Sequence, residues 1–310
     1  MCKNSDCRIE RELYDDRYGF KGSFRLAKCL KCGHRHLQGE FTPELISRLY
    51  SEYYPRSAFK LEEHKPFIEA KGFFAWLKGK NSSAFRWVPK NVRVLDIGCG
   101  FGETLGYHKA RGCDVYGVEA DRNILRVAER FGYKVHAGLF EPDIYEPASF
   151  DYVTMDQVLE HTIDPVVALM GVRKVLKEGG VAVLSMPNPD GWGARVFGKR
   201  WINWHVPYHI QHFSFESMKI LAEKADFKIE KTCTITDSSW LWLQWLHLLT
   251  YPKEGEPSEF WASNGRITSG KRKIARVITL FHLTGADHLF TRFFDFLNIG
   301  DNYIFVLKKI

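Results

Sequence analysis

The stretch VLDIGCGFGETL, residues 94–105, constrains the fold of this chain most, because an apolar run leads into glycines at every second position. A strand, a glycine turn and a helical pattern in this order are typical of a nucleotide-binding βαβ unit. After Gly98, Gly100 and Gly102, Glu103 occupies the position where a dinucleotide fingerprint has its last glycine. A carboxylate there would compete with a pyrophosphate for the helix N-terminus. A cofactor that carries ammonium and sulfonium groups would tolerate it, so the turn predicts S-adenosylmethionine (SAM) rather than NAD.

Apolar segments alternate with helical patterns from residue 92 onward, which predicts parallel strands joined by right-handed crossovers in an α/β doubly wound sheet. The last segment, NYIFVLKK, follows an inserted region at 238–298 with no crossover helix, and it is therefore expected to pair antiparallel. The segments expected to form the earlier strands are VRVLDIG, DVYGVE, YKVHAG, FDYVTM, GVAVLSMP and FKIEKTCTI.

An acidic residue supports this βαβ unit. Glu119 ends the second expected strand, about 20 residues after the first glycine, where a carboxylate can accept hydrogen bonds from both ribose hydroxyls. Together, VLDIGCGFGETL, GVEAD and FDYVTMDQVLEHTIDPVVALMGVRKVLKEGGVAVLSMPN resemble the successive motifs of class I SAM-dependent methyltransferases. They are most similar to the ubiquinone-biosynthesis-type O-methyltransferases, over roughly residues 92–235.

The resemblance implies a seven-stranded Rossmann-like sheet with its last strand antiparallel, and a set of cofactor contacts. Residues near the methionine end of SAM would be Asp96, Gly98, Cys99, Gly100 and Gly102. Glu119 would hold the ribose, Ala120, Gly138 and Leu139 would border the adenine, and Asp156 and Gln157 would lie near the methyl group.

Methyl transfer to oxygen usually needs a base, and histidine is the side chain whose ordinary pKa suits that role. Candidates are His161 in LEHTIDP and His205, His209 and His212 in WINWHVPYHIQHFS. The second stretch should cover the carboxyl edge of the sheet, where substrates bind in open α/β folds. We rank His209 first among the three later histidines, then His205 and His212. For His161, fixing the loop after the fourth strand is an equal alternative.

The acceptor is constrained by a missing motif. An Asn or Asp followed by Pro-Pro and an aromatic residue marks amino methylation of nucleic-acid bases in this fold, and the corresponding region here reads TMDQVLEH. This favours an oxygen or activated carbon acceptor on a small molecule or a saccharide.

Four of the seven cysteines lie in the first 40 residues. Cys2 and Cys7 are followed after 21 residues by Cys29 and Cys32, and CLKCGHRH is typical of half of a zinc knuckle. We expect a closed, structural zinc site, in which His34 or His36 could replace a missing ligand. Unliganded thiols and a disulfide are the alternatives.

The intervening LYDDRYGFKGSFRLAKC resembles a zinc-ribbon extension of bacterial methyltransferases of polysaccharide and sugar-nucleotide biosynthesis. Those extensions generally begin C-x2-C, from which this chain departs. The resemblance suggests that Tyr14, Arg17, Tyr18 and Tyr53 could face the active site, with ordinary packing as the alternative. The expected domains are a zinc ribbon at 1–40, a helical linker and cap at 41–90, and a SAM-binding domain at 91–310.

The insertion at 238–298 is rich in tryptophan and apolar residues around the basic run GKRKIAR. Such a composition resembles an interfacial membrane anchor over residues 240–298, and a helical cap packed on the sheet or a dimer interface is the favoured alternative. The N-terminus carries charges where a signal peptide would be apolar, and seven cysteines suit a reducing compartment. We therefore expect a cytoplasmic protein, with possible peripheral contact to the inner face of the membrane.

These features together predict a SAM-dependent methyltransferase that methylates a hydroxyl of a sugar, a lipid-linked glycan or another small molecule. One alternative is a zinc-ribbon RNA methyltransferase, which a net charge of +7 would suit. The charge is spread along the chain, so nucleic acid is the less favoured partner. A second alternative is a SAM-binding scaffold without activity.

Overall fold

The computed structural model describes residues 6–54, 60–262 and 265–310. Its centre is a seven-stranded sheet in the order β10-β11-β8-β7-β4-β5-β6. The strands are β4 (Arg93–Ile97), β5 (Asp114–Glu119), β6 (Lys134–Ala137), β7 (Phe150–Asp156), β8 (Leu176–Pro187), β10 (Phe227–Thr234) and β11 (Asn302–Lys309). β11 runs antiparallel to both β8 and β10, whereas β4, β5, β6, β7 and β8 pair in parallel. The predicted fold class is confirmed, including the antiparallel last strand.

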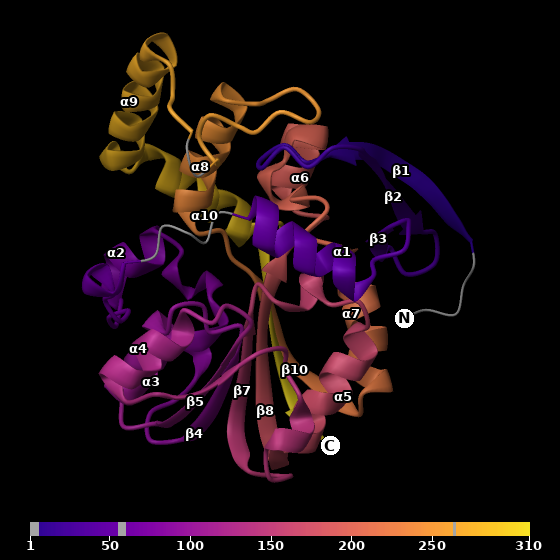
Figure 1. Cartoon of the computed structure of the whole chain (residues 1–310), viewed down its shortest axis with the longest axis vertical. Helices are drawn as coiled ribbons and strands as arrows, with labels where there is room; N and C mark the ends of the chain where they lie inside the picture. The colour runs from indigo at the N-terminus through magenta and orange to yellow at the C-terminus, as the bar shows by residue number, and fades with distance from the viewer. Residues whose placement is uncertain (1–5, 55–59, 263–264) are drawn as a thin grey trace.

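Helices cover both faces of this sheet (Figure 1). One side carries α3 (Glu103–Lys109) and α4 (Ile124–Phe131), and the other carries α5 (Pro165–Val175) and α7 (Phe215–Lys224). Leu95, Val153 and Leu184 from the central strands are fully buried in one cluster with Leu169 of α5 and Leu221 of α7. Burial on both faces explains why the strands read as continuous apolar runs.

A second sheet of four strands joins distant parts of the chain. Its order is β1-β2-β3-β9, from β1 (Cys7–Tyr14), β2 (Ser23–Cys29), β3 (Arg35–Leu37) and β9 (Gln211–His212). The register places Arg35 opposite His212 and His36 opposite Gln211. The cysteine-rich N-terminal strands are therefore hydrogen-bonded to the histidine-rich segment that follows β8.

That histidine-rich segment lies inside the molecule. Every residue from Trp201 to Ile210 is buried. Its apolar side chains share one core with Leu13 of β1, Leu26 of β2 and Ala194 of α6 (Trp192–Phe197). The N-terminal sheet thus packs on this segment.

The region between β3 and β4 begins with α1 (Pro43–Arg48), where the Thr42 hydroxyl accepts a hydrogen bond from the Leu45 amide, as the Thr-Pro pattern predicts. Figure 1 shows α1 between the seven-stranded sheet and the parts of the molecule above it. α2 (Gly72–Leu77) follows and has no buried residue.

The insertion before β11 consists of α8 (Ser238–Leu249), α9 (Ser269–Thr284) and α10 (Ala286–Phe296). These helices contact one another, and α10 also contacts α2. None of the sixteen residues of α9 is buried. Across the described ranges, no helix has both the length and the apolar character needed to cross a bilayer.

Candidate functional site

The glycine turn connects β4 to α3 through residues with positive φ angles. Gly98, Gly100 and Gly102 have φ values of 75°, 58° and 84°, a region that L side chains rarely adopt. A Cβ at Gly98 would lie 2.4 Å from Cγ2 of Val158, so this glycine is needed for packing within the protein. A Cβ at Gly100 would meet nothing within 4 Å. The open space at Gly100 fits a turn that a ligand approaches closely.

Glu119 ends β5 and holds this turn. Its Oε2 accepts a hydrogen bond from the Gly100 amide at 3.1 Å, and its Oε1 accepts one from the Asp121 amide at 2.8 Å. The amides of Gly98 and Cys99 also donate to the carbonyl of Val118 on β5. The acidic residue and the glycine turn therefore lie together at the carboxyl end of adjacent strands, where the spacing predicts them.

Asp96 faces the interior of the protein. It is 1% exposed, and its two carboxylate oxygens accept hydrogen bonds from the hydroxyls of Thr104 and Thr154, the latter at 2.6 Å. Burial raises its pKa to about 7. Cys99 is also buried, and burial raises the pKa of its thiol well above the ordinary value. In this structure both side chains belong to the support of the turn.

The edge of the sheet beside the turn presents the other residues expected to contact the cofactor. Ala120 and Leu139 are exposed, and the Gly138 amide donates to the Glu119 carbonyl at 2.9 Å. Leu139 is 76% exposed, which is unusual for a leucine at a strand end and offers an apolar surface to a ring system.

Asp156 and Gln157 follow β7 at the same edge. The Asp156 carboxylate accepts from the Ser185 hydroxyl, and burial raises its pKa to about 6. Gln157 has a positive φ of 56°, and its side-chain amide donates to Oδ1 of Asn302 at 2.7 Å. The strand ends of β7, β8 and β11 are thus tied together where the methyl group is expected.

Three of the four candidate histidines lie together next to this edge. His161 ends a short 3-10 turn, Leu159–His161, immediately after β7. Its ring centroid is 4.6 Å from that of His209, which is 4.8 Å from that of His205. The His209 Nδ1 lies 2.9 Å from the Asn203 carbonyl. Burial lowers the pKa of His205 and His209 well below the ordinary value, so both rings are neutral at physiological pH.

The fourth candidate, His212, lies at the border of this group, with its ring centroid 6.1 Å from that of His209. It lies in β9, where it pairs with Arg35, and its buried ring packs edge-on against Trp204. Burial lowers its pKa to about 3.

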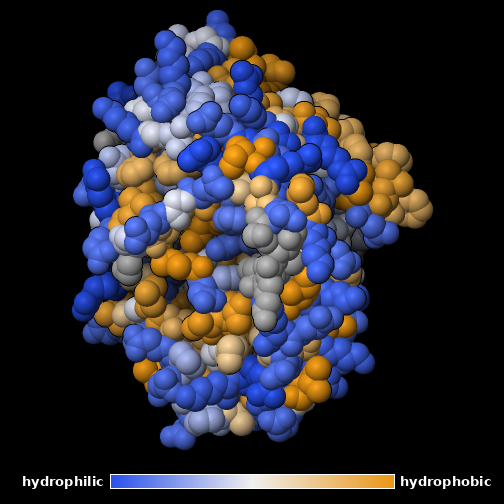
Figure 2. All heavy atoms as spheres, turned by 90° about the vertical axis from the view of Figure 1, so that its right-hand side faces the viewer, coloured by the Kyte–Doolittle hydropathy of each residue, from blue (hydrophilic) through white to orange (hydrophobic). Residues whose placement is uncertain are grey.

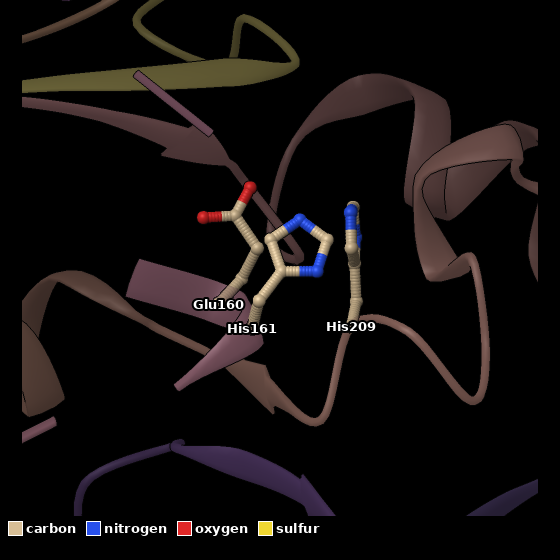
Figure 3. A group of neighbouring side chains, drawn as sticks. All are labelled: Glu160, His161 and His209. Atoms are coloured by element: carbon tan, nitrogen blue, oxygen red, sulfur yellow. The ribbon is translucent and has the colours of Figure 1, made fainter. Parts of the chain in front are cut away.

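Glu160 adds a carboxyl group to the histidine cluster (Figure 3). It is 1% exposed, and in the part of the chain that the structure describes no other residue donates a hydrogen bond to its oxygens. Burial raises its pKa to about 8. Ligand atoms of Glu160, His161 and His209 lie within 4.8 Å of one another. Such a cluster could hold a divalent cation or accept and relay a proton.

Tyrosine rings surround the histidines. The Tyr50 hydroxyl is 2.9 Å from Nδ1 of His161, and the Tyr208 carbonyl is 3.0 Å from the same atom. Tyr54 and Tyr18 pack edge-on or tilted against Tyr208 and His205. Among the tyrosines, Tyr18 was the only cluster member that the sequence suggested. The spacing of Tyr50, Tyr53 and Tyr54 in LYSEYY could have indicated the others.

The remaining residues suggested by the zinc-ribbon resemblance lie apart from the histidines or support them. The Tyr14 hydroxyl donates to the Pro252 carbonyl at 2.9 Å, and Tyr53 packs on Phe20. Arg17 is buried, donates to the Ile202 carbonyl and lies 4.4 Å from the ring of Trp261.

Three of the predicted zinc ligands gather at one pocket, while Cys2 lies outside the described residues. Cys7 and Cys29 are paired across β1 and β2, and Cys29, Cys32 and Cys7 line the pocket together with His34 and His36. The Gly33 amide donates to the Cys29 carbonyl, which closes the tight turn between the two thiols. Figure 2 faces the side that carries these strands and shows a largely hydrophilic surface with apolar side chains around a hollow. The thiols fit a structural zinc ion chemically, and zinc binding stays a prediction.

Comparison with known proteins gives a family for most of this architecture. A family model described as a methyltransferase domain matches residues 44–232. The match includes the glycine turn, Glu119 and the whole histidine cluster.

Curated relatives match a smaller part. The chain is 34% identical over 127 residues to the ubiquinone biosynthesis O-methyltransferase of Cereibacter sphaeroides, covering 38% of this chain and 51% of the relative. It is 37% identical over 126 residues to the enzyme of the same name from Roseobacter denitrificans, covering 36% and 50%. The chain spans about half the length of the curated relatives it matches.

A solved structure supports the fold. The phosphoethanolamine N-methyltransferase 2 of Haemonchus contortus, in complex with S-adenosyl-L-methionine, superposes with a TM-score of 0.51 at 18% identity. The superposition covers 89% of this chain and 62% of the other. At this identity the likeness concerns the fold alone.

Proposed function

Because the chain belongs to the methyltransferase domain family, we propose that it transfers a methyl group from SAM to a hydroxyl oxygen of its acceptor. The observation that carries the oxygen acceptor is the group of three histidines beside the glycine turn, two of which are buried and neutral. Val158 packs on Gly98, and His161 follows three residues later, so the segment that carries the proposed base also contacts the proposed cofactor turn. The names of the curated relatives also support transfer to oxygen.

We propose the following roles for the residues at the turn. Glu119 would accept hydrogen bonds from the ribose hydroxyls, and Ala120 and Leu139 would contact the adenine. The open space at Gly100 supports a close approach of the methionine end. When bound, SAM supplies an electrophilic methyl group on a sulfonium sulfur.

His161 is the base that the geometry favours. Of the three clustered histidines it alone is half-exposed, whereas His205 and His209 are buried. If Nδ1 carries the proton that is donated to the Tyr208 carbonyl, Nε2 is the basic atom of the ring. As the acceptor oxygen bonds to the methyl carbon and the carbon–sulfur bond breaks, the hydroxyl proton passes to Nε2. The ring of His209 packs edge-on against that of His161, with the centroids 4.6 Å apart, and would hold the His161 ring in place.

Substitution of His161 by asparagine tests this assignment. We expect turnover to fall by about 10²- to 10⁴-fold, as for loss of a general base, with the SAM affinity unchanged in calorimetry. Tyr14→Phe is the matched control, because the Tyr14 hydroxyl bonds to Pro252 away from the cluster. Turnover of His161→Asn equal to that of the wild type would overturn the role of His161.

The proposed acceptor is a hydroxyl of a sugar, a lipid-linked glycan or a related small molecule. Stacked tyrosine rings with a few polar groups suit an acceptor that has both apolar faces and hydroxyls. Incubation with labelled SAM and fractionated acceptors tests the class: sugar nucleotides, lipid-linked glycans, quinone precursors and RNA. Label in RNA alone would favour the RNA methyltransferase alternative, and SAM binding without transfer to any fraction would favour a scaffold.

Membrane contact is proposed for a surface that we call the apolar surface, formed by the exposed side chains of α2, α9 and α10. It includes aromatic and aliphatic residues that are 47–83% exposed: Phe73, Phe74, Trp76, Val277, Leu280, Phe281, Leu283, Leu289, Phe290, Phe293 and Phe296. α9 also carries Lys271, Arg272, Lys273 and Arg276 and no acidic residue. Lys271 pairs with Glu259. Apolar side chains beside the remaining basic residues of α9 suit the surface of an anionic bilayer, on which a lipid-linked acceptor would be presented.

A further inference from the structure

A second cluster of histidine and aspartate lies far from the proposed catalytic residues, where α9 meets α10. His282 is in the last turn of α9, and Asp287 and His288 are in the first turn of α10. Gly285, with φ of +81°, reverses the chain between them. The sharp turn therefore brings three potential ligands from two helices to one point.

The geometry of the cluster converges on the carboxylate. Nδ1 of His282 lies 2.5 Å from Oδ2 of Asp287, and Nδ1 of His288 lies 3.1 Å from Oδ1. The imidazole centroids are 4.8 Å apart, with ring planes nearly perpendicular at 82°. All three ligand atoms lie within 4.8 Å of one another.

Burial leaves part of this cluster without a hydrogen bond. Asp287 and His288 are 3% and 5% exposed. Among the described residues, neither Oδ1 of Asp287 nor Nδ1 of His288 makes a hydrogen bond, although the two atoms are 3.1 Å apart. A buried polar atom without a partner costs about 1–3 kcal/mol. The two imidazoles are the groups that the structure pairs with Asp287, since the nearby Arg292 pairs with Asp295.

We propose that His282, Asp287 and His288 bind a divalent transition metal ion of the zinc type. Two imidazoles and one carboxylate form a donor set that suits zinc rather than magnesium or calcium. Ligand atoms around a tetrahedral zinc ion lie about 3.3 Å apart, given metal–ligand bonds of about 2.0 Å. The distances from the two imidazole Nδ1 atoms to the carboxylate, 2.5 and 3.1 Å, and the limit of 4.8 Å for the whole group lie on either side of this value. Three protein ligands leave a fourth position for water.

The surroundings support the ligands as outer partners do in metal sites. The ring of Trp242 from α8 stacks on His282, with centroids 5.9 Å apart and planes at 28°. Its Nε1 donates to the Thr279 hydroxyl at 3.1 Å, which fixes the indole on α9. Such contacts hold a ligand ring in the orientation that binding needs.

The metal would clamp the three helices of the insertion together. α9 has no buried residue, so few apolar contacts hold it in place. A metal bound by the end of α9 and the start of α10, with Trp242 of α8 against it, would fix the hairpin that presents the apolar surface.

The test compares the zinc content of the purified full-length chain with that of a His282→Gln/His288→Gln variant. Both proteins keep all cysteines, so zinc at the N-terminal thiols contributes equally to each. We expect the double variant to lose about one equivalent of zinc. Glu254→Gln, which replaces an exposed carboxyl in the same insertion, should lose none. Equal zinc contents in wild type and double variant would overturn the proposal.

A measurement on the unaltered protein covers the case in which the variant fails to fold. Crystals of the wild-type chain grown with zinc should give an anomalous scattering peak between the three side chains at the zinc absorption edge. A map that contains no peak there, while zinc is present in the crystal solution, would refute the site.

Discussion

Replacing Glu160 by glutamine should change the pH dependence of stability in a defined direction. Burial raises the pKa of this carboxyl from 4.5 to about 8. An acid whose pKa is higher in the folded than in the unfolded protein binds more protons when folded, at every pH between the two values. The free energy of unfolding therefore falls as the pH rises from 4.5 to 8, and glutamine, which cannot ionise, removes this fall.

The size of the effect follows from the two pKa values. Each pH unit between them costs about 1.4 kcal/mol, which gives an upper bound of about 5 kcal/mol. Relaxation around a buried charge reduces such energies, so we expect about 2–4 kcal/mol. Below pH 4.5 the carboxyl is protonated in both states, and the wild type and the variant should differ little.

Urea unfolding followed by tryptophan fluorescence at pH 5, 6, 7 and 8.5 measures this difference. Asp96 and Asp301 also have raised pKa values, and because they titrate in both proteins they cancel in the comparison. Glu146→Gln, which removes an exposed carboxyl, is the control. A stability difference that is the same at all four pH values would refute burial as the cause. So would a variant that is less stable at pH 8.5, since that result would mean that the ionised carboxylate is held by a cation.

Three further outcomes are expected. Gly100→Ala should cost about 1 kcal/mol of stability for the positive φ. Because the added Cβ meets no protein atom and enters the space proposed for SAM, the variant should lose SAM binding in calorimetry. Retained affinity would argue against the proposed cofactor turn. Cys29→Ser should remove one equivalent of zinc and lower the melting temperature by several degrees, and an unchanged metal content would exclude a thiolate site. Phe281→Ser/Phe293→Ser should abolish flotation with anionic vesicles, whereas wild-type protein that fails to float would contradict membrane contact.

The parts of the fold that the sequence predicted are those that local patterns encode. Doubly buried strands read as apolar runs, and a strand that follows an insertion without a crossover helix pairs antiparallel, as β11 does. Boundaries were less accurate: β8 begins at Leu176, before the expected segment, because Leu176 pairs with Phe150 ahead of the turn at Gly179.

The candidate site was predictable only where its residues follow strands. Gly98 and Glu119 were found because their positions relative to β4 and β5 are set by the βαβ unit. The contact of Tyr50 with His161 joins residues 111 positions apart, so it depends on tertiary packing that no periodicity records. Glu160 was missed for the same reason, since a carboxyl becomes unusual only once its burial is known.

The pairing of β3 with β9 has a consequence for experiments that separate the parts of this protein. Because the cysteine strands supply a neighbour for the backbone just after His209, an isolated core that lacks residues 1–40 would lose the edge against which that segment is held. The N-terminal module should therefore be inherited together with the histidine segment, and exchanging either one alone between related proteins should yield folded but inactive chimaeras.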